Sequence, residues 1–446
     1  MPSMSSPTRT KTREALIVGG GLAGLAAAAR FSSLGWQVRV FEKGSRWGGL
    51  IGSTRHPNGI IEHAAHALIH TSAVARAARQ AGVELEGALP SARRRYFAHD
   101  GRLSRWPLGP MDSLRVLRGL WRLRQSDQVR PRVAESVSEW GERIFGPNFV
   151  GKVLTPALQG VHASPAASLH AGAVLTRFFG SRPSRRTSER VRPKGSVAPA
   201  GGMQDFVDAL VRQAQTHGAE LCLNRSASLR DLRPSEKLIF AGSARAAVQF
   251  LSAPEAEWKV IADFEDREIE DLRDVISSLN EVKMLGLISV TLHRSQKFCD
   301  GFGAVFLEAH QHGILGVLQN DAIFEGRNNV GNKLASETWI LGGHAFDKAW
   351  LERSDQEILQ RLEEHRARFR RPVAGQTQEI LNYEIHRWPD AIPHYDGAIG
   401  RGAKLWARPR GRWALTGNYL GNIGTAGFFA RAEELEAHWR DADGDL

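Results

Sequence analysis

The sequence contains very little cysteine and no long hydrophobic run. Its 446 residues include two cysteines, Cys222 and Cys299. These are too few for a disulfide framework or a cysteine-rich metal site, which fits a reducing compartment. No segment approaches the roughly 18 to 20 apolar residues that cross a bilayer, and residues 1–14 lack the apolar run of a signal peptide. We therefore expect a cytoplasmic protein, with any membrane contact peripheral and on the inner face of the membrane.

Acidic residues are also scarce relative to basic ones. Lys and Arg total 59 against 48 Asp and Glu, which gives a net charge of +11 and a pI near 10.0. This balance favours an acidic partner (nucleic acid, anionic lipid or an acidic substrate), although a generally arginine-rich composition would also produce it. The basic stretch Arg182–Lys194 has no interleaved aromatic residues, unlike a nucleic-acid-binding surface. We predict that it is a charged loop and that nucleic acid is not a partner.

The chain is longer than one hydrophobic core normally serves, so we expect roughly two or three lobes. Near the N-terminus the pattern predicts a buried strand over Ala15–Val18, a helix over Leu22–Phe31 and a second strand over Trp36–Phe41. Trp413–Trp439 again gives strand, glycine turn and helix, and strand-like runs recur from Trp258 to Leu341. The sequence therefore predicts an α/β fold, with a Rossmann-like domain assembled from both termini around inserted lobes.

The turn after the first strand carries a dinucleotide-binding fingerprint. Gly19, Gly21 and Gly24 satisfy G-x-G-x-x-G. The first glycine permits a tight turn, the second lets the backbone approach a pyrophosphate, and the third lets helix and strand pack closely. Amides at the positive end of the helix dipole would face the phosphates, and a carboxylate at the end of the second strand could accept hydrogen bonds from ribose hydroxyls. The predicted contacts from this unit are Gly19, Gly21, Leu22, Ala23, Gly24, Glu42 and Lys43.

The segments that follow resemble the amine-oxidase-like flavoproteins. Ser45–Gly49 resembles their R-x-G-G extension, whose arginine and glycine amides reach the pyrophosphate and ribityl region of FAD. Leu415–Asn418 and Ile423–Thr425 resemble the second cofactor segment, which in that group meets the flavin ring at a helix N-terminus. The carboxylate of Glu42 also disfavours NADP, whose 2′-phosphate it would repel. The resemblance implies FAD, contacted by Arg46, Gly48, Gly49, Gly417, Ile423, Gly424 and Thr425.

Other segments resemble the protoporphyrinogen oxidase family within this superfamily. Arg387–Tyr395 closely matches W-x-x-A-I-P-Q-Y and is the most specific of them. The similarity runs over most of the chain. The remaining matches are the E-S-V…F-G helix at Glu135–Gly146, then Pro156 and Gly160–Ala163, the glycine turn at Ala200–Met203, and G-N-Y at Gly417–Tyr419.

This resemblance implies FAD-dependent oxidation of a porphyrinogen, protoporphyrinogen IX or coproporphyrinogen III, in haem or other tetrapyrrole biosynthesis. Hydride would pass from a ring-bridging carbon to flavin N5, and oxygen or another acceptor would reoxidise the flavin. Because the cofactor supplies most of this chemistry, we assign no catalytic side chain. The match also implies that Ala64, Ala65, His66 and Trp388 line the cofactor.

Arg95 is the residue that the resemblance assigns to the substrate. It lies in Arg93–Tyr96 and aligns with a family arginine that pairs with a propionate. A planar guanidinium can hold a carboxylate bidentately. The alternative is that three consecutive arginines form a solvated surface.

The chain departs from the family at two places. Glu62–His66 stands where E-x-G-P is usual, so the turn beside the flavin must differ, and Ala426-Gly427 stands near a usual D-C pair. Two alternatives therefore stay open. One is a related amine oxidase or carotenoid-type desaturase, and the other is a catalytically idle flavin-binding partner protein. The A-I-P-x-Y segment and Arg95 favour the porphyrinogen.

Two further patterns allow more than one interpretation. His63, His66 and His70 have near-helical spacing, but only Glu62 stands nearby as a further ligand, so we predict no metal site. A predicted basic amphipathic helix suits an anionic membrane surface, as in the often monotopic protoporphyrinogen oxidases, although an ordinary core-facing helix is the alternative. Its apolar and basic residues are Leu114, Leu117, Leu120, Trp121, Arg115, Arg118 and Arg122.

These patterns together predict a domain organisation. FAD-binding parts are expected over residues 12–90, 195–255 and 381–446. A helical lobe that contacts substrate or membrane is expected over 91–194, and an α+β substrate-binding domain over 256–380.

Overall fold

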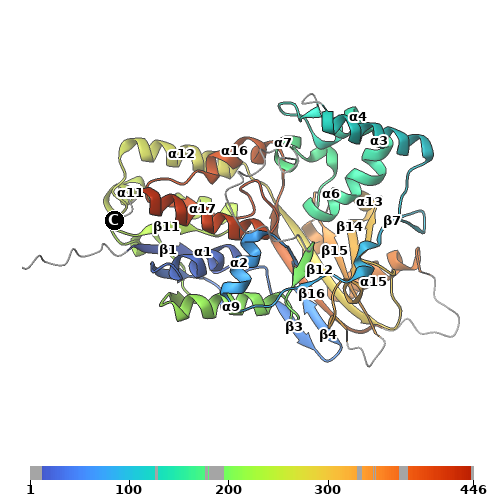
Figure 1. Cartoon of the computed structure of the whole chain (residues 1–446), viewed down its shortest axis with the longest axis horizontal. Coiled ribbons are helices and arrows are strands. Elements are labelled where there is room, and N and C mark those ends of the chain that lie inside the picture. The colour runs from blue at the N-terminus through green and yellow to red at the C-terminus, as the bar shows by residue number, and fades with distance from the viewer. Residues whose placement is uncertain are drawn as a thin grey trace, which may run out of the picture.

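The structure is a computed structural model that describes residues 13–125, 129–175, 179, 195–328, 334–344, 346, 348–370 and 380–442. The predicted loop Arg182–Lys194 lies outside the described residues. Figure 1 shows a parallel sheet covered by helices on the left, a large mixed sheet on the right, and a helical lobe above the mixed sheet.

The parallel sheet is built from strands far apart in the sequence. Its order is β10 (Glu220–Cys222), β2 (Gln37–Phe41), β1 (Glu14–Val18), β11 (Lys237–Phe240) and β17 (Trp413–Leu415), and all neighbouring pairs are parallel. Both chain ends contribute, so the α/β fold predicted from the sequence is confirmed.

Strand alternation explains why helices cover both faces of this sheet. Ala15 and Ile17 of β1 belong to one hydrophobic core, whereas Leu16 between them belongs to another, because successive strand residues point to opposite faces. The first core is closed by α1 (Leu22–Ser32), α2 (Ser72–Gln80), α9 (Met203–Thr216) and α17 (Ala426–Ala442). The second is closed by α10 (Ala244–Leu251), α11 (Glu255–Ile261), α12 (Asp266–Asn280) and α16 (Gly397–Ala407).

The mixed sheet has the order β16 (Ile380–Pro393), β12 (Met284–Arg294), β15 (Ala335–Gly342), β14 (Ile314–Gln319), β13 (Gly303–Phe306), β7 (Arg95–His99) and β8 (Arg102–Ser104). It is antiparallel except where β13 runs parallel to β7. Its core includes Ile358 and Leu362 of α15 (Asp355–Ala367). The strands come from three of the predicted ranges, 91–194, 256–380 and 381–446, whose boundaries remain predictions.

Short elements connect these layers. The hairpin β3 (Ser53–His56)–β4 (Gly59–Glu62) extends from the flavin domain. The remaining short elements are β5 (Leu68–Ile69), β6 (Glu86–Gly87), β9 (Ser196–Ala198), α13 (Ala309–His312) and α14 (Asn320–Ile323).

The helical lobe contains α3 (Pro110–Gln125), α4 (Val137–Phe145), α5 (Pro147–Phe149), α6 (Thr155–His162) and α7 (Ala171–Val174). Ser136 and Glu139 form a capping box at the start of α4, which satisfies amides that the first helical turn leaves without partners. Among the described helices, none combines the length and apolar character that a transmembrane span needs.

The predicted strand-like character from Trp258 onward is wrong over the first part of that range. Helices α11 and α12 occupy residues 255–261 and 266–280, and the first strand begins only at Met284. In α12, Ile269, Leu272 and Val275 are buried on one face, the three-residue spacing of a helix. A capping box between Glu265 and Glu268 fixes its start.

Candidate functional site

The fingerprint glycines occupy positions where a side chain would not fit. Gly19 leaves β1 with φ +110°, and a Cβ there would lie 3.1 Å from the backbone of Ala241, which follows β11. A Cβ on Gly24 would come within 1.9 Å of the Gly19 carbonyl oxygen. The first and third glycines therefore permit the turn and the close contact of helix and strand.

The N-terminus of α1 fits a phosphate group. Gly21 is its N-cap residue, no side chain caps the helix, and the first turn, Leu22–Gly24, contains no acidic residue. The nearest atom to a Cβ on Gly21 would be the Gly49 Cα at 3.9 Å, so the space beside Gly21 is open. Uncapped amides at the positive end of a helix dipole form an anion site, as the pyrophosphate of FAD requires.

Glu42 lies at the end of β2, at the same edge of the parallel sheet. Its carboxylate accepts hydrogen bonds from the amides of Gly20 (2.6 Å) and Gly44 (2.7 Å), while the neighbouring Lys43 is exposed. Each carboxylate oxygen has a further acceptor site, so Glu42 could also hold ribose hydroxyls.

Sequence reasoning missed a second loop at this edge. The amide of Arg225, after β10, donates to the Glu42 carbonyl (2.9 Å), and its guanidinium lies over the Phe41 ring at 3.8 Å. Because β10 spans only three residues, its hydrophobic pattern was too short to locate this loop.

The Ser45–Gly49 segment packs against the fingerprint turn. Gly48 donates from its amide to the Gly20 carbonyl (2.8 Å), and a Cβ on Gly20 would lie 2.4 Å from the Trp47 ring. The exposed guanidinium of Arg46 donates to the carbonyls of Gly49 (2.5 Å) and Ile51 (2.8 Å). In this structure the Arg46 side chain therefore forms hydrogen bonds within its own loop, which lies next to the open space beside Gly21.

The Glu62–His66 segment is tied to β16, because the indole of Trp388 donates to the His63 carbonyl (3.2 Å). Burial lowers the pKa of His66 to about 3, so its ring is neutral. Its Nε2 is buried and has no hydrogen-bond partner among the described residues. Ala64 and Ala65 beside it are half-buried. An unpaired ring nitrogen here fits a polar atom of a bound molecule.

A buried ion pair anchors the start of this segment. The Glu62 carboxylate lies 3.2 Å from Arg327 and accepts a hydrogen bond from Ser53 (2.6 Å). Burial raises the pKa of Glu62 to about 7, against the opposing effect of Arg327.

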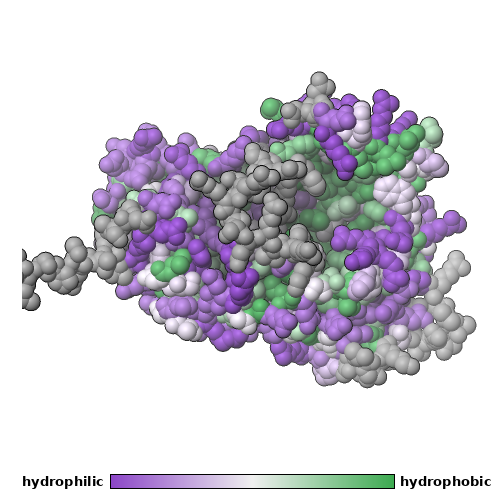
Figure 2. All heavy atoms as spheres, viewed as in Figure 1, coloured by the Kyte–Doolittle hydropathy of each residue, from purple (hydrophilic) through white to green (hydrophobic). Residues whose placement is uncertain are grey.

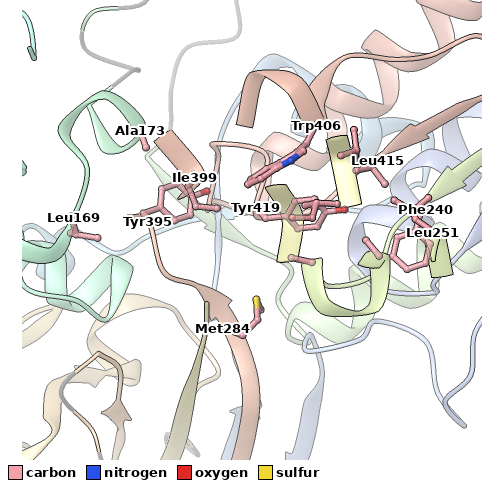
Figure 3. Close-up of a cluster of buried hydrophobic side chains, with 14 of the residues drawn as sticks. Leu169, Ala173, Phe240, Leu251, Met284, Tyr395, Ile399, Trp406, Leu415 and Tyr419 are labelled. Atoms are coloured by element: carbon pink, nitrogen blue, oxygen red, sulfur yellow. The ribbon is translucent and has the colours of Figure 1, made fainter. Parts of the chain in front are cut away.

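The segment after β16 meets two other family-like segments. The Tyr395 hydroxyl donates to the Asn418 carbonyl (2.5 Å), and the His170 amide donates to the Tyr395 carbonyl (2.8 Å). The His162 ring lies 4.9 Å from the Tyr395 ring, edge to face. Figure 3 shows Tyr395 between Leu169 of the helical lobe and Tyr419, in a buried cluster that continues to Leu415 of β17. The matched segments are thus neighbours in space.

The predicted C-terminal contacts lie between β17 and α17. Gly417 follows β17 by two residues, and Ile423, Gly424 and Thr425 immediately precede α17; all four are half-buried. The first turn of α17 has no acidic residue, so it presents a second helix N-terminus at the edge of the sheet where β1 and β2 end.

Arg95 stands apart from these residues. It is exposed at the start of β7, with its guanidinium 4.6 Å from the centre of the Phe302 ring. Four strands lie between β7 and β16, so five inter-strand spacings of about 4.8 Å put the two strands on the order of 24 Å apart. The structure therefore does not place Arg95 beside Trp388, and its substrate role remains a prediction.

The chain is similar to a known protein family and to several known proteins. The family model described as flavin containing amine oxidoreductase matches residues 22–428. The chain is 25% identical to the mitochondrial protoporphyrinogen oxidase of Nicotiana tabacum, over 50% of this chain and 51% of that protein. It is 22% identical to the coproporphyrinogen III oxidase of Propionibacterium freudenreichii, over 92% of this chain and 87% of that one. The match spans about half the length of the plant relatives.

The fold also matches solved structures. A protein of Exiguobacterium that has been proposed to be a protoporphyrinogen oxidase superposes with a TM-score of 0.68 at 17% identity, covering 96% of this chain and 99% of that one. At this identity the likeness shows the fold alone.

Proposed function

The chain belongs to the flavin-containing amine oxidoreductase family and is an FAD-dependent oxidoreductase, and we propose that its substrate is a porphyrinogen. The observation that carries this proposal is the meeting of three segments at Tyr395: its own A-I-P-H-Y segment, the G-N-Y segment at Asn418, and the helical segment at His162. All three segments resemble protoporphyrinogen oxidase, and the A-I-P-H-Y segment is the most specific match. Two relatives whose names specify protoporphyrinogen or coproporphyrinogen oxidation support the same substrate class.

The side chains at this meeting point suit an uncharged macrocycle. Burial lowers the pKa values of His162 and His394 to about 4, so both rings are neutral at physiological pH. Burial also raises the pKa of the Tyr395 hydroxyl, which stays protonated and donates to the backbone. The uncharged, largely apolar groups gathered here suit the face of a porphyrinogen, while its propionates need cations at the periphery.

FAD, when bound, supplies the hydride acceptor. The chain's own residues bind and orient. The amides of the first α1 turn would hold the FAD pyrophosphate, and the Glu42 carboxylate would hold the adenosine ribose. We infer that Arg95 at the start of β7 holds a propionate.

Anaerobic addition of substrate to the purified yellow protein tests this proposal. Protoporphyrinogen IX or coproporphyrinogen III is expected to bleach the flavin absorbance while porphyrin fluorescence grows. Bleaching by amines alone would replace the proposal with an amine oxidase. A flavin that no donor bleaches would indicate a binding partner without catalysis.

When the rate of bleaching is measured against porphyrinogen concentration in this assay, Arg95→Ala is expected to raise the apparent Kd of the porphyrinogen roughly 10-fold or more, since a charge-assisted hydrogen bond contributes about 1.5–3 kcal/mol. FAD content should stay unchanged. Arg94→Ala, an exposed neighbour, is the matched control. Equal loss of FAD and of substrate affinity, or equal effects of the two variants, would remove Arg95 from the substrate role.

We also propose that α3 contacts an anionic membrane surface. Its buried residues are Val116 and Gly119, whereas the predicted apolar face points outward, with Leu117 62% and Trp121 59% exposed. Figure 2 shows hydrophobic residues gathered on the part of the helical lobe that includes α3. The alternative, an ordinary helix whose apolar face packs into the core, is therefore wrong for these residues. The other exposed apolar residues of this face are Met111, Leu114 and Leu120.

Leu117→Gln combined with Trp121→Gln is expected to weaken binding to vesicles containing anionic lipid by at least about 100-fold, since burying each side chain contributes about 1.5–3 kcal/mol. The fold should be unaffected because both side chains are exposed. Val260→Gln, 83% exposed on α11, is the control. Co-sedimentation with vesicles measures the effect, and undiminished binding of the double variant would refute the membrane contact.

A further inference from the structure

One face of strand β16 packs onto the β3–β4 hairpin of the flavin domain. Thr54 of β3 donates a hydrogen bond to this face (3.0 Å), Asn58 in the turn donates another (2.8 Å), and the His63 carbonyl accepts a third (3.2 Å). Residues two apart on a strand point to the same side. The alternate residues of β16 on this face are Asn382, Glu384, His386 and Trp388.

Three ligand-type side chains converge within this contact. His63, Glu384 and His386 each offer one donor atom, and these atoms lie within 4.8 Å of one another. Oε1 of Glu384 lies 2.8 Å from Nε2 of His386 and 3.7 Å from Nε2 of His63. The two imidazole rings stack with their centres 4.0 Å apart. All three residues are half-buried.

The Nε2 atom of His386 is not satisfied by this arrangement. It is buried and has no properly directed hydrogen bond with any described residue, although Glu384 is only 2.8 Å away. A buried polar atom left in this way costs about 1–3 kcal/mol. A cation between the carboxylate and the two rings would give each donor a partner.

We propose that His63, Glu384 and His386 bind a divalent transition-metal ion, with Zn²⁺ as the best-matched species. Two imidazole nitrogens and one carboxylate oxygen suit Zn²⁺, whereas Ca²⁺ and Mg²⁺ require more oxygen ligands. Bonds of about 2.0–2.1 Å in a tetrahedral shell place donors about 3.3 Å apart. The spacings of 2.8 and 3.7 Å bracket that value.

The bound ion would tie the mixed sheet to the flavin domain. His63 belongs to the Glu62–His66 segment, and the other two ligands belong to β16, more than 300 residues later in the chain. The Thr54 hydroxyl, now 2.8 Å from Nε2 of His63, would keep its hydrogen bond to Glu384 and leave the fourth metal position to water. This link between the two domains does not depend on which substrate is oxidised.

Zinc titration of the FAD-loaded, chelator-treated protein tests the site. Competition with a chromogenic chelator should give one Zn²⁺ per chain. Co²⁺ should give the visible d–d absorption of a low-coordinate site, at wavelengths longer than those of the flavin. His386→Ala and Glu384→Ala are expected to weaken zinc binding at least about 100-fold, more than the loss of an outer-shell partner. Zinc should raise the Tm of the unmodified protein but not that of His386→Ala or Glu384→Ala.

Two variants separate a metal site from a hydrogen-bond network. Thr54→Val removes a hydrogen bond but no ligand, so it should still bind one ion. His99→Ala removes a half-buried histidine that lies 3.1 Å from Asp100 and should change nothing. Equal zinc binding by His386→Ala and the unmodified protein would overturn the proposal, as would equal damage from Thr54→Val and His386→Ala. Glu384→Gln, which keeps the side-chain shape, provides the comparison if His386→Ala fails to fold.

Discussion

Gly21→Asp is expected to abolish FAD binding while leaving the chain folded. The backbone of Gly21 has φ −70° and ψ 176°, which any residue adopts, and a Cβ there would meet nothing closer than 3.9 Å. Aspartate is also a favourable N-cap residue and stabilises a helix start by a few tenths of a kcal/mol relative to glycine. Its carboxylate, however, would occupy the space where the pyrophosphate approaches and would repel that group.

The expected loss of FAD affinity is at least about 100-fold, which corresponds to about 3 kcal/mol. Flavin absorbance after gel filtration measures retention, and circular dichroism checks the fold. Gly109→Asp is the matched control, because Gly109 also immediately precedes a helix, α3, with open space around its Cβ position. A yellow, stoichiometrically loaded Gly21→Asp protein would contradict the cofactor position.

Acid is expected to destabilise the protein strongly between pH 6.5 and 5. Burial lowers the pKa of His66 and of His365 to about 3 and that of His162 to about 4, from an ordinary value of 6.5. Below pH 6.5 the unfolded chain therefore binds more protons than the folded chain. The stability from these neutral rings is complete above pH 6.5 and is lost as the pH falls toward the folded-state values.

Each such histidine costs about 1.4 kcal/mol per pH unit in this window, or roughly 6 kcal/mol for the three by pH 5. Protonation of Glu62 has the opposite effect on the stability of the folded chain. Because its pKa is raised to about 7 from 4.5, the folded chain takes up that proton first and gains stability as the pH falls below 7. This offsets roughly one histidine, which leaves a loss of about 4 kcal/mol from these four groups, a large part of the stability of a typical domain. Burial also lowers the pKa values of His63 and His394 to about 4, which adds to the loss in the same direction.

His365→Gln isolates one contribution to this acid sensitivity. His365 is buried in the mixed-sheet domain against Phe306, with ring centres 4.5 Å apart. The substitution changes packing at every pH, but the slope of unfolding free energy against pH should fall by about 1.4 kcal/mol per unit. Denaturant titrations from pH 7 to 5 measure this slope. His217→Gln on the exposed end of α9 should leave it unchanged. Identical slopes for all three proteins would show that His365 is not held neutral.

Local sequence patterns predicted the elements of the dinucleotide-binding unit well and those that follow from Trp258 poorly. The first helix was expected over Leu22–Phe31 and spans Leu22–Ser32. Trp258 was instead assigned to a run of strands, although it lies in a helix that is only seven residues long. Alternating apolar and polar residues over so short a span fit either structure, and the packing of α11 and α12 against one face of the parallel sheet decides between them.

The sequence by itself determined the dinucleotide unit, because the residues that fix it are close neighbours in the chain. Gly19 must turn at φ +110°, Gly24 must touch Gly19, and Glu42 ends the next strand. Only the tertiary structure decided that His63 meets β16, 325 residues beyond it at Trp388, and that Arg95 lies four strands from that contact. Such pairings depend on how sheets and hairpins pack against each other, and side-chain periodicity within a segment carries no information about its distant partner.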